Sequence, residues 1–216
     1  MKRIITAALL TFSFASHAEL VSTDWKTTGD ELATLDTETG IEWLDLSETH
    51  ELSIDNVVSM TSAGGKFEGW RLPTQAEVTV LFHTLFPAGI STGKLTSTEK
   101  YGADITSFYE LFGYTSTDAS RSYGLYQRDN TSEVRMAGVS GSDTVFANYS
   151  HPLYSTSLSH QYYGVWLVSD GGDTISSIDD PSLNIMNPNS PYNVPLAGSG
   201  ALALLALGAG GRRKRQ

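Results

Sequence analysis

The sequence predicts an α+β fold for the central part of this 216-residue chain. Three observations support this class. Two strand-like runs flank the turn-forming residues 36–40, helix-capping side chains begin amphipathic segments between residues 53 and 113, and short β-prone runs follow from residue 123 onward. Strands that precede and follow a group of helices, instead of alternating with them, are typical of an α+β domain.

The first part of this domain is expected to be a strand and a β-hairpin. Residues 19–25 form a short apolar-polar run that predicts the first strand, and residues 32–35 and 41–46 predict the two strands of the hairpin. Gly40 ends the turn between them, because glycine adopts a positive φ without steric cost. Apolar and polar residues alternate imperfectly in 41–46, so both faces of that strand should be partly covered.

Three helices are predicted to follow the hairpin. Each begins at a side chain that can cap a helix and ends at glycine or before proline. The expected boundaries are Ser53 to residues 63–65, Thr74 to Pro87, and Asp104 to Gly113. Residues 90–100 are polar and rich in Gly, Ser and Thr, so this segment is predicted to be a loop.

Residues 69–77, Gly-Trp-Arg-Leu-Pro-Thr-Gln-Ala-Glu, form the most distinctive string in the chain. Pro73 restricts its own φ and keeps Leu72 extended. Thr74 stands three residues before Glu77, which is the spacing of a capping box. The string therefore predicts a buried strand end, a rigid corner and a helix start.

Two interpretations of Arg71 remain open at this point. In the first, the guanidinium faces a ligand. In the second, it pairs with an acid such as Glu42 or Asp45 and locks the helix to the hairpin, while Glu77 completes the helix cap. The second interpretation gives the motif a structural role.

The second half of the domain is predicted to be rich in strands. The three shorter runs are residues 123–126, 134–139 and 143–149, and the first two flank a turn signal. Residues 163–168, Tyr-Gly-Val-Trp-Leu-Val, are nearly all apolar and β-prone, so we expect them to form a central strand. The domain should end at residue 169, and residues 170–193 should form a flexible acidic linker.

Both ends of the chain have the features of targeting segments. Residues 1–18 combine a basic start, an apolar run and small terminal residues, which predicts the helix of a cleaved signal peptide and hence export. Residues 194–211 carry no charge and precede the basic cluster Arg212, Arg213, Lys214 and Arg215. This order predicts a hydrophobic helix whose basic end stays on the cytoplasmic side of a membrane.

Composition excludes several classes of function. The chain has 14 Lys and Arg against 24 Asp and Glu; six of the cations lie in the two ends, so eight remain in the body against 24 acids, a formal charge near −16. An acidic body lacks the basic surface that nucleic acids require, so no nucleic-acid partner is expected. The absence of cysteine excludes disulfides, thiolate catalysis and cysteine-bound zinc.

The C-terminal segment, residues 194–216, resembles a PEP-CTERM-type protein-sorting signal. Val194 and Pro195 stand where that family has a short proline-containing motif, although the Glu and the second Pro of the motif are absent. The resemblance implies signal peptidase and an exosortase-type enzyme as processing partners in a Gram-negative bacterium. It also implies an intermediate tethered transiently to the inner membrane and a final location at the cell surface or outside the cell.

Three motifs of the body resemble the Lcl C-terminal-type domain of exported bacterial proteins. They are residues 40–45 with Trp43, residues 67–77 with Trp70, Arg71, Leu72, Pro73, Thr74 and Glu77, and residues 164–168 with Trp166. The Arg-Leu-Pro-Thr-x-x-Glu core is also similar to the formylglycine-generating-enzyme and sulfatase-modifying family. The resemblance implies a C-type-lectin-like fold, in which two to three helices pack on a small, twisted, mostly antiparallel sheet and the final strand is central and close to the first hairpin.

The chemistry of those families is not implied. Formylglycine generation needs paired cysteines, which the chain lacks, and the Glu-Pro-Asn, Gln-Pro-Asp and Trp-Asn-Asp motifs of lectin calcium sites are absent. No cofactor is therefore expected. Asp170, Asp173 and residues 179–180 offer a weak calcium site, or they belong to a solvated acidic linker.

Aromatic residues in the late loops are the best candidates for ligand binding. Such side chains on polar loops can stack on sugars or contact proteins, and they can equally cover a sheet. The candidates are Tyr149, His151, Tyr154, His160 and Tyr162, with Tyr163 next to them.

The expected function is that of a non-catalytic exported surface or matrix protein, whose body binds a ligand such as extracellular polysaccharide or coats the surface. The alternative is a secreted hydrolase or modifying enzyme with a site built from the late loops. That alternative requires His151 or His160 to lie within hydrogen-bond reach of a carboxylate and a nucleophilic hydroxyl.

Overall fold

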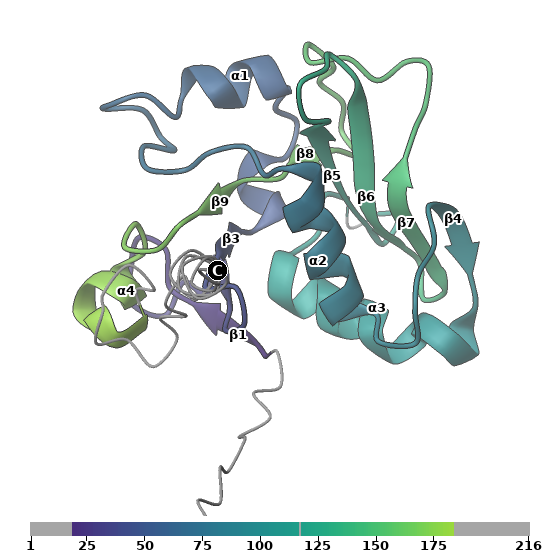
Figure 1. Cartoon of the computed structure of the whole chain (residues 1–216), viewed down its shortest axis with the longest axis horizontal. Coiled ribbons are helices and arrows are strands. Elements are labelled where there is room, and N and C mark those ends of the chain that lie inside the picture. Colours follow the sequence, from purple (N-terminus) through teal and green to yellow (C-terminus); the bar gives the residue numbers. More distant parts are fainter. Residues whose placement is uncertain (1–18, 117, 184–216) are drawn as a thin grey trace, which may run out of the picture.

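The computed structural model describes residues 19–116 and 118–183, and these residues form two β-sheets, four α-helices and two short 3₁₀ helices (Figure 1). The predicted α+β class is therefore confirmed. The predicted signal peptide, residues 1–18, and the predicted sorting segment, residues 194–216, lie outside the described residues.

The N-terminal strands belong to a four-stranded antiparallel sheet. Its order is β1 (Leu20–Thr23), β2 (Ala33–Asp36), β3 (Glu42–Leu44) and β9 (Val168–Ser169). The predicted first strand and hairpin are confirmed, because β1 pairs with β2 and β2 pairs with β3. Gly40 has a φ of 69° in the hairpin turn, and the 3₁₀ helix η1 (Leu46–Thr49) follows β3.

The later strands form a five-stranded sheet. Its order is β4 (Gly93–Thr96), β7 (Thr144–Tyr149), β6 (Val134–Ser140), β5 (Arg121–Gln127) and β8 (Gly164–Val165). Neighbouring strands are antiparallel except β5 and β8, which are parallel. The three shorter runs predicted in this half correspond to β5, β6 and β7. The strand pairing is mostly antiparallel, as expected, but the described residues form two sheets where the resemblance implies one small sheet.

Residues 163–168 do not form the predicted central strand. They contribute to β8, at the edge of the five-stranded sheet, and to β9, at the edge of the four-stranded sheet. Trp166 N–H donates to Leu125 O at 3.0 Å and Leu44 N–H donates to Leu167 O at 3.1 Å, so the backbone between the two strands joins the sheets. Trp166 and Leu167 are fully buried in different apolar clusters. Residues 163–168 are apolar because they pass between two apolar clusters. Their expected closeness to the first hairpin is confirmed, because β9 pairs with β3.

The first two helices, α1 (Ile54–Ser59) and α2 (Gln75–Leu85), begin as predicted. Ser53 caps α1 and Thr74 caps α2, each through a side chain that accepts a hydrogen bond from the backbone N–H three residues later. α1 ends at Ser59, with Met60 as its C-cap, before the glycines at positions 64 and 65, and is therefore shorter than predicted.

The third helix, α3 (Thr98–Phe112), begins earlier than predicted. Its N-cap is Ser97 and not Asp104, and the Ser97 hydroxyl accepts from Lys100 N–H at 3.2 Å. The buried residues of the helix begin only at Tyr101, so the apolar pattern alone indicates too late a start. The predicted loop 90–100 is also wrong, because it contains β4 and the first turn of α3. Gly113 ends α3 with a φ of 65°, as expected.

The five-stranded sheet carries an apolar cluster on each face. On one face it packs against α2 and α3 (Figure 1), and the Trp166 ring lies 6.3 Å from the Phe82 ring and 6.0 Å from the Phe108 ring. The other face packs against a second cluster that includes the indoles of Trp25 and Trp70. Both faces of this sheet are therefore covered, and each can support a site.

Residues 170–183 are folded, although the sequence predicts a flexible linker from residue 170. They include two short helices near the four-stranded sheet (Figure 1), α4 (Ile175–Asp179) and the 3₁₀ helix η2 (Pro181–Leu183). Thr174 is fully buried, and its hydroxyl donates to Glu42 Oε1 at 2.5 Å. Ile175 N–H donates to Trp25 O at 2.8 Å. These contacts extend the domain beyond its predicted end at residue 169.

Candidate functional site

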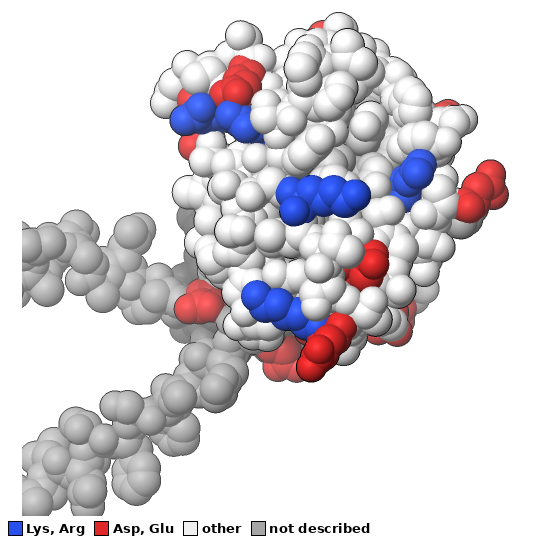
Figure 2. Space-filling view, turned by 90° about the vertical axis from the view of Figure 1, so that its right-hand side faces the viewer, with Lys and Arg blue, Asp and Glu red and all other residues white. Residues whose placement is uncertain are grey.

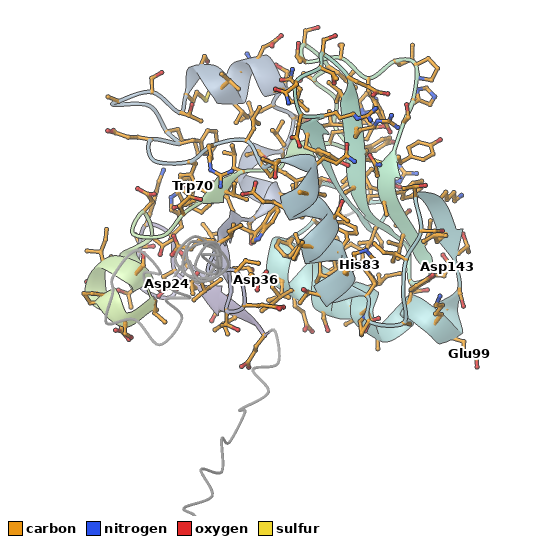
Figure 3. All side chains as sticks on the ribbon, in the orientation of Figure 1. Asp24, Asp36, Trp70, His83, Glu99 and Asp143 are labelled. Carbon is orange, nitrogen blue, oxygen red and sulfur yellow. The ribbon has the colours of Figure 1, made fainter. Side chains whose placement is uncertain are left out.

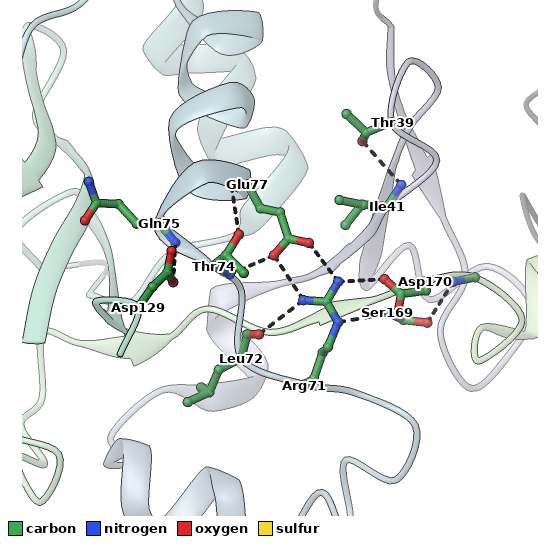
Figure 4. Close-up of polar contacts among 11 residues, drawn as sticks. Thr39, Ile41, Arg71, Leu72, Thr74, Gln75, Glu77, Asp129, Ser169 and Asp170 are labelled. Carbon is green, nitrogen blue, oxygen red and sulfur yellow. Dashed lines mark hydrogen bonds and ion pairs between the residues drawn. The ribbon is translucent and has the colours of Figure 1, made fainter. Parts of the chain in front are cut away.

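The Arg71 guanidinium is held by two carboxylates (Figure 4). Its Nη1 and Nη2 atoms donate to Glu77 Oε2 and Oε1 at 3.0 and 2.7 Å, and Nη2 also donates to Asp170 Oδ1 at 2.6 Å. The predicted partners Glu42 and Asp45 are wrong, because both side chains are buried elsewhere and form no ion pair with Arg71. Arg71 therefore links the start of α2 to the residue that follows β9.

Glu77 also completes the cap of α2. Its Oε2 atom accepts from Thr74 N–H at 2.7 Å, and Thr74 Oγ1 accepts from Glu77 N–H at 3.1 Å. Burial alone would raise the pKa of Glu77, but the hydrogen bonds from Arg71 and Thr74 outweigh burial and lower it. The backbones of Arg71 and Val168 exchange two further hydrogen bonds, at 2.8 and 2.9 Å. The geometry of this motif favours the structural interpretation.

A β-bulge in β7 decides which side chains face which side of the five-stranded sheet. Phe146 and Tyr149 are three residues apart, but they pair with residues of β6 that are only two apart. Ala147 and Asn148 form the bulge, and Asn148 has a φ of 48°. Both of these residues face α2, whereas Phe146 and Tyr149 share the opposite face.

An aromatic hollow of about 330 Å³ lies on the face that carries Phe146 and Tyr149. Strands β5, β6 and β7 and the loop of residues 150–163 all contribute to its lining. The lining residues are Tyr123, Met136, Phe146, Tyr149, His151, Leu153, Tyr154, Leu158, His160 and Tyr163.

Tyr154 lies among the rings that line the aromatic hollow. Its ring centroid is 5.4 Å from that of His151, 6.4 Å from that of Tyr149 and 5.7 Å from that of Tyr163. Burial, with a further contribution from Tyr163, raises the pKa of the Tyr154 phenol well above its ordinary value, so this group stays neutral. His160 extends the set, with its ring 5.6 Å from that of Tyr163. The rings form one connected aromatic surface.

The structure brings four of the five predicted ligand-binding residues together in this hollow, namely Tyr149, His151, Tyr154 and His160. The fifth, Tyr162, does not line it, because its ring lies against the Arg121 guanidinium at 4.3 Å. Sequence reasoning missed Tyr123 and Phe146, which belong to strands and not to the late loops. Their only sequence signal is an aromatic residue inside a strand-like run.

Among the described residues, neither His151 nor His160 forms a hydrogen bond or ion pair with a carboxylate. His151 Nδ1 accepts from Leu153 N–H at 3.3 Å, and the His160 ring contacts the rings of Tyr162 and Tyr163. Among the described residues that line the aromatic hollow, none carries a carboxylate. The arrangement offers rings and neutral polar groups for binding.

Two acids of the predicted weak calcium site, Asp170 and Asp173, have protein partners. Asp170 accepts from Arg71, and Asp173 Oδ2 accepts from Ser169 Oγ at 2.6 Å. Within residues 19–116 and 118–183, no three His, Asp or Glu side chains lie close enough together to hold a metal ion.

Charged side chains are sparse near the edge of the five-stranded sheet. Figure 2 shows the side of the molecule that carries β4 and β7, where most of the surface is uncharged and the charged side chains occur in a few small groups. In the part of the chain that the structure describes, no helix combines the length and the apolar character needed to span a membrane. Comparison with protein-family models, with curated proteins and with solved structures gave no match for this chain.

Proposed function

We propose that this chain is a non-catalytic, exported carbohydrate-binding protein that holds neutral polysaccharide in the aromatic hollow. The observation that carries the proposal is the connected set of rings around Tyr154. His151 and His160 at its rim are exposed, and Leu153 is 73% exposed. A polymer can therefore reach these rings without a rearrangement of the fold.

The composition of the hollow suits a sugar. The apolar face of a sugar ring packs on aromatic rings, while its hydroxyl groups need neutral donors and acceptors nearby. The phenols and imidazoles of the lining, including Tyr149, His151 and His160, supply hydrogen-bonding atoms. A volume of about 330 Å³ lies at the lower end of the roughly 300–1,000 Å³ that is typical of ligand sites, so most of a polymer would remain outside the hollow.

Charge favours a neutral polymer over an anionic one. The chain has a formal net charge of −10. Among the described residues that line the hollow, none is Lys or Arg. A sulfated or uronic-acid polymer would therefore meet a chain of negative net charge and no cation in the lining itself; the Lys94 ammonium lies outside the lining, 5.8 Å from the Phe146 ring.

The proposal includes a C-type-lectin-like fold of the Lcl C-terminal type. The first supporting feature is the pairing of β9, near the end of the domain, with β3 of the first hairpin. Close to this pairing the ring centroids of Trp43 and Trp166 lie 5.5 Å apart, edge to face. The junction of Arg71 with Glu77 at the start of α2 is the second supporting feature.

The proposed route of export depends on the two ends of the chain. Residues 1–18 would direct export, and residues 194–216 would hold the protein at the inner membrane until an exosortase-type enzyme removes them. Truncation after Tyr192 tests this route. The shortened protein should lose normal processing and surface location, and an unchanged location would show that the tail is not a sorting signal.

Affinity electrophoresis of the full chain tests the binding function. Each gel would contain one neutral polymer (a β-glucan, an α-glucan, a mannan or a galactan), and a matched gel would contain alginate as the anionic control. We expect retardation by at least one neutral polymer and none by alginate. No retardation in any neutral gel would refute the proposal. Release of reducing sugar from a retained polymer would instead favour the hydrolase alternative.

A further inference from the structure

A second hollow lies on the other face of the five-stranded sheet. Its volume is about 250 Å³, and it lies between α2, the segment of residues 90–92 and β7. We call it the α2 pocket. Its polar lining side chains include Gln75, Thr79, His83, Tyr126 and Asn148. His83 extends from α2, between that helix and the strands in the view of Figure 3. The α2 pocket shares no lining residue with the aromatic hollow.

The bulge in β7 directs Asn148 into the α2 pocket. Asn148 has a φ of 48° inside a strand, a conformation that L residues adopt rarely outside turns. Asn130, with a φ of 56°, lies in the turn between β5 and β6, where the same conformation is ordinary. A strained backbone conformation persists only where the surrounding structure holds it in place. Such positions, including β-bulges, are found most often at functional sites.

Tyr126 fixes the orientation of the Asn148 amide. The Tyr126 Oη atom donates to Asn148 Oδ1 at 3.0 Å. Tyr126 is fully buried and burial raises the pKa of its phenol, so the donated proton stays in place at neutral pH. The NH₂ group of Asn148 is then left as a donor with a fixed direction.

The remaining lining defines the chemical class of ligand. The polar side chains are amides, hydroxyls and an imidazole, and among the described lining residues none is Asp, Glu, Lys or Arg. Phe82 and Ile90 supply apolar surface beside them. Neutral donors and acceptors next to an apolar wall match a small, uncharged polyhydroxy ring. We propose that the α2 pocket binds one neutral monosaccharide, independently of polymer binding in the aromatic hollow.

Titration of the full chain with single sugars, followed by NMR of its amide groups, tests this proposal. The probes are glucose, galactose, mannose and N-acetylglucosamine, with glucuronic acid as the charged comparison. We expect saturable shifts of the Asn148 and Gln75 side-chain amide signals with at least one neutral sugar. Glucuronic acid should bind at least tenfold more weakly, because no cation faces it. No saturable shift with any of the four neutral sugars would overturn the proposal.

Two glycine variants separate binding from folding. Asn148→Gly keeps the positive φ without strain and removes the amide, so sugar affinity, followed at the Gln75 side-chain amide, should fall at least tenfold. Asn130→Gly makes the same change in a turn outside the pocket and should bind as the wild type does. Equal affinity of Asn148→Gly and wild type would overturn the proposal.

A variant of the aromatic hollow separates monosaccharide binding in the α2 pocket from polymer binding in the aromatic hollow. Tyr154→Ala should leave the Asn148 shifts unchanged even if polymer binding is lost. Loss of the monosaccharide shifts in Tyr154→Ala would place the sugar in the aromatic hollow and contradict a separate site.

Discussion

Arg71 and Asp170 are 99 residues apart in the chain, yet Arg71 Nη2 donates to Asp170 Oδ1 at 2.6 Å. The same guanidinium binds the helix-capping carboxylate of Glu77 through two hydrogen bonds. One side chain thus connects the corner before α2 to the end of β9, where the chain leaves the four-stranded sheet. A guanidinium bound in this way is more specific in geometry than a single surface ion pair.

Replacement of Arg71 by methionine should destabilise the domain. We expect the free energy of unfolding to fall by about 1–2 kcal/mol, because Glu77 and Asp170 lose their shared donor while the partly exposed site still admits water. Urea unfolding measures this loss. Arg128→Met is the matched control: its pair with Glu133 is exposed on both sides, so the variant should change stability less than Arg71→Met does. Equal losses in the two variants would contradict a special role for Arg71.

Thr174 should be essential for stability although it lies beyond the predicted end of the domain. Its buried hydroxyl donates to Glu42 Oε1 and accepts from Ser177 N–H. Thr174→Val removes the hydrogen bond that the Thr174 hydroxyl donates to the buried Glu42 carboxyl, so we expect a loss of roughly 1.5–3 kcal/mol in the free energy of unfolding. Thermal unfolding measures it. Thr106→Val on the exposed face of α3 is the control and should cost no more than about 0.5 kcal/mol. A small effect of Thr174→Val would show that the Thr174 hydroxyl contributes little to holding residues 170–183 on the domain.

Asp45 should make the domain less stable as pH rises toward 8. Burial raises its pKa from 3.8 to about 8, with smaller contributions from Glu48 and Asp30. Between these values the unfolded chain has released the proton and the folded chain has kept it, so stability falls as pH rises. Asp45→Asn should remove much of this slope and stabilise the domain by up to a few kcal/mol near pH 8. Unfolding curves across this range test the sign.

The unfolding curves of wild type and Asp45→Asn at low pH are the control for this prediction. Near pH 4 the Asp45 carboxyl is largely protonated in the folded chain and about half protonated in the unfolded chain, so wild type and Asp45→Asn should differ little. A variant that is equally stabilised at both ends of the range would show that the buried charge is not the cause.

Some elements could be predicted because their signals are local. The starts of α1 and α2 depend on Ser53 and Thr74, whose partners are three residues away, and both caps are present. The hairpin of β2 and β3 depends on a short turn that ends at Gly40. In these cases one or two side chains determine the backbone locally.

Other elements were missed because their partners are distant in sequence. β4 lies in a Gly-, Ser- and Thr-rich segment and exists through β7, with Gly93 opposite Ala147. Residues 163–168 are as apolar as a central strand. The reason is that Trp166 and Leu167 pack into two different apolar clusters. Periodicity cannot distinguish these two environments.

Most loop residues of the candidate site could be predicted from the sequence, but which of them share one face of the sheet could not. Tyr149 faces the aromatic hollow only because the bulge at Asn148 places its side chain on the same face of the sheet as Phe146. No local sequence signal reveals a bulge. Tyr162 and Tyr163 are adjacent and equally aromatic, yet only Tyr163 lines the hollow. The strand residues Tyr123 and Phe146 join the site through tertiary packing.

The proposed function requires that the aromatic hollow bind polysaccharide. Its most direct test is calorimetric titration of the polymer retained in affinity gels into wild type, Tyr154→Ala, Tyr154→Phe and Tyr162→Ala. Tyr154→Ala should weaken binding about tenfold or more, equivalent to about 1.4 kcal/mol, because it removes a ring that contacts three others. Tyr154→Phe keeps the ring and Tyr162→Ala lies outside the hollow, so both should bind within about twofold of wild type. Wild-type affinity in Tyr154→Ala, or an equal loss in Tyr162→Ala, would contradict the claim.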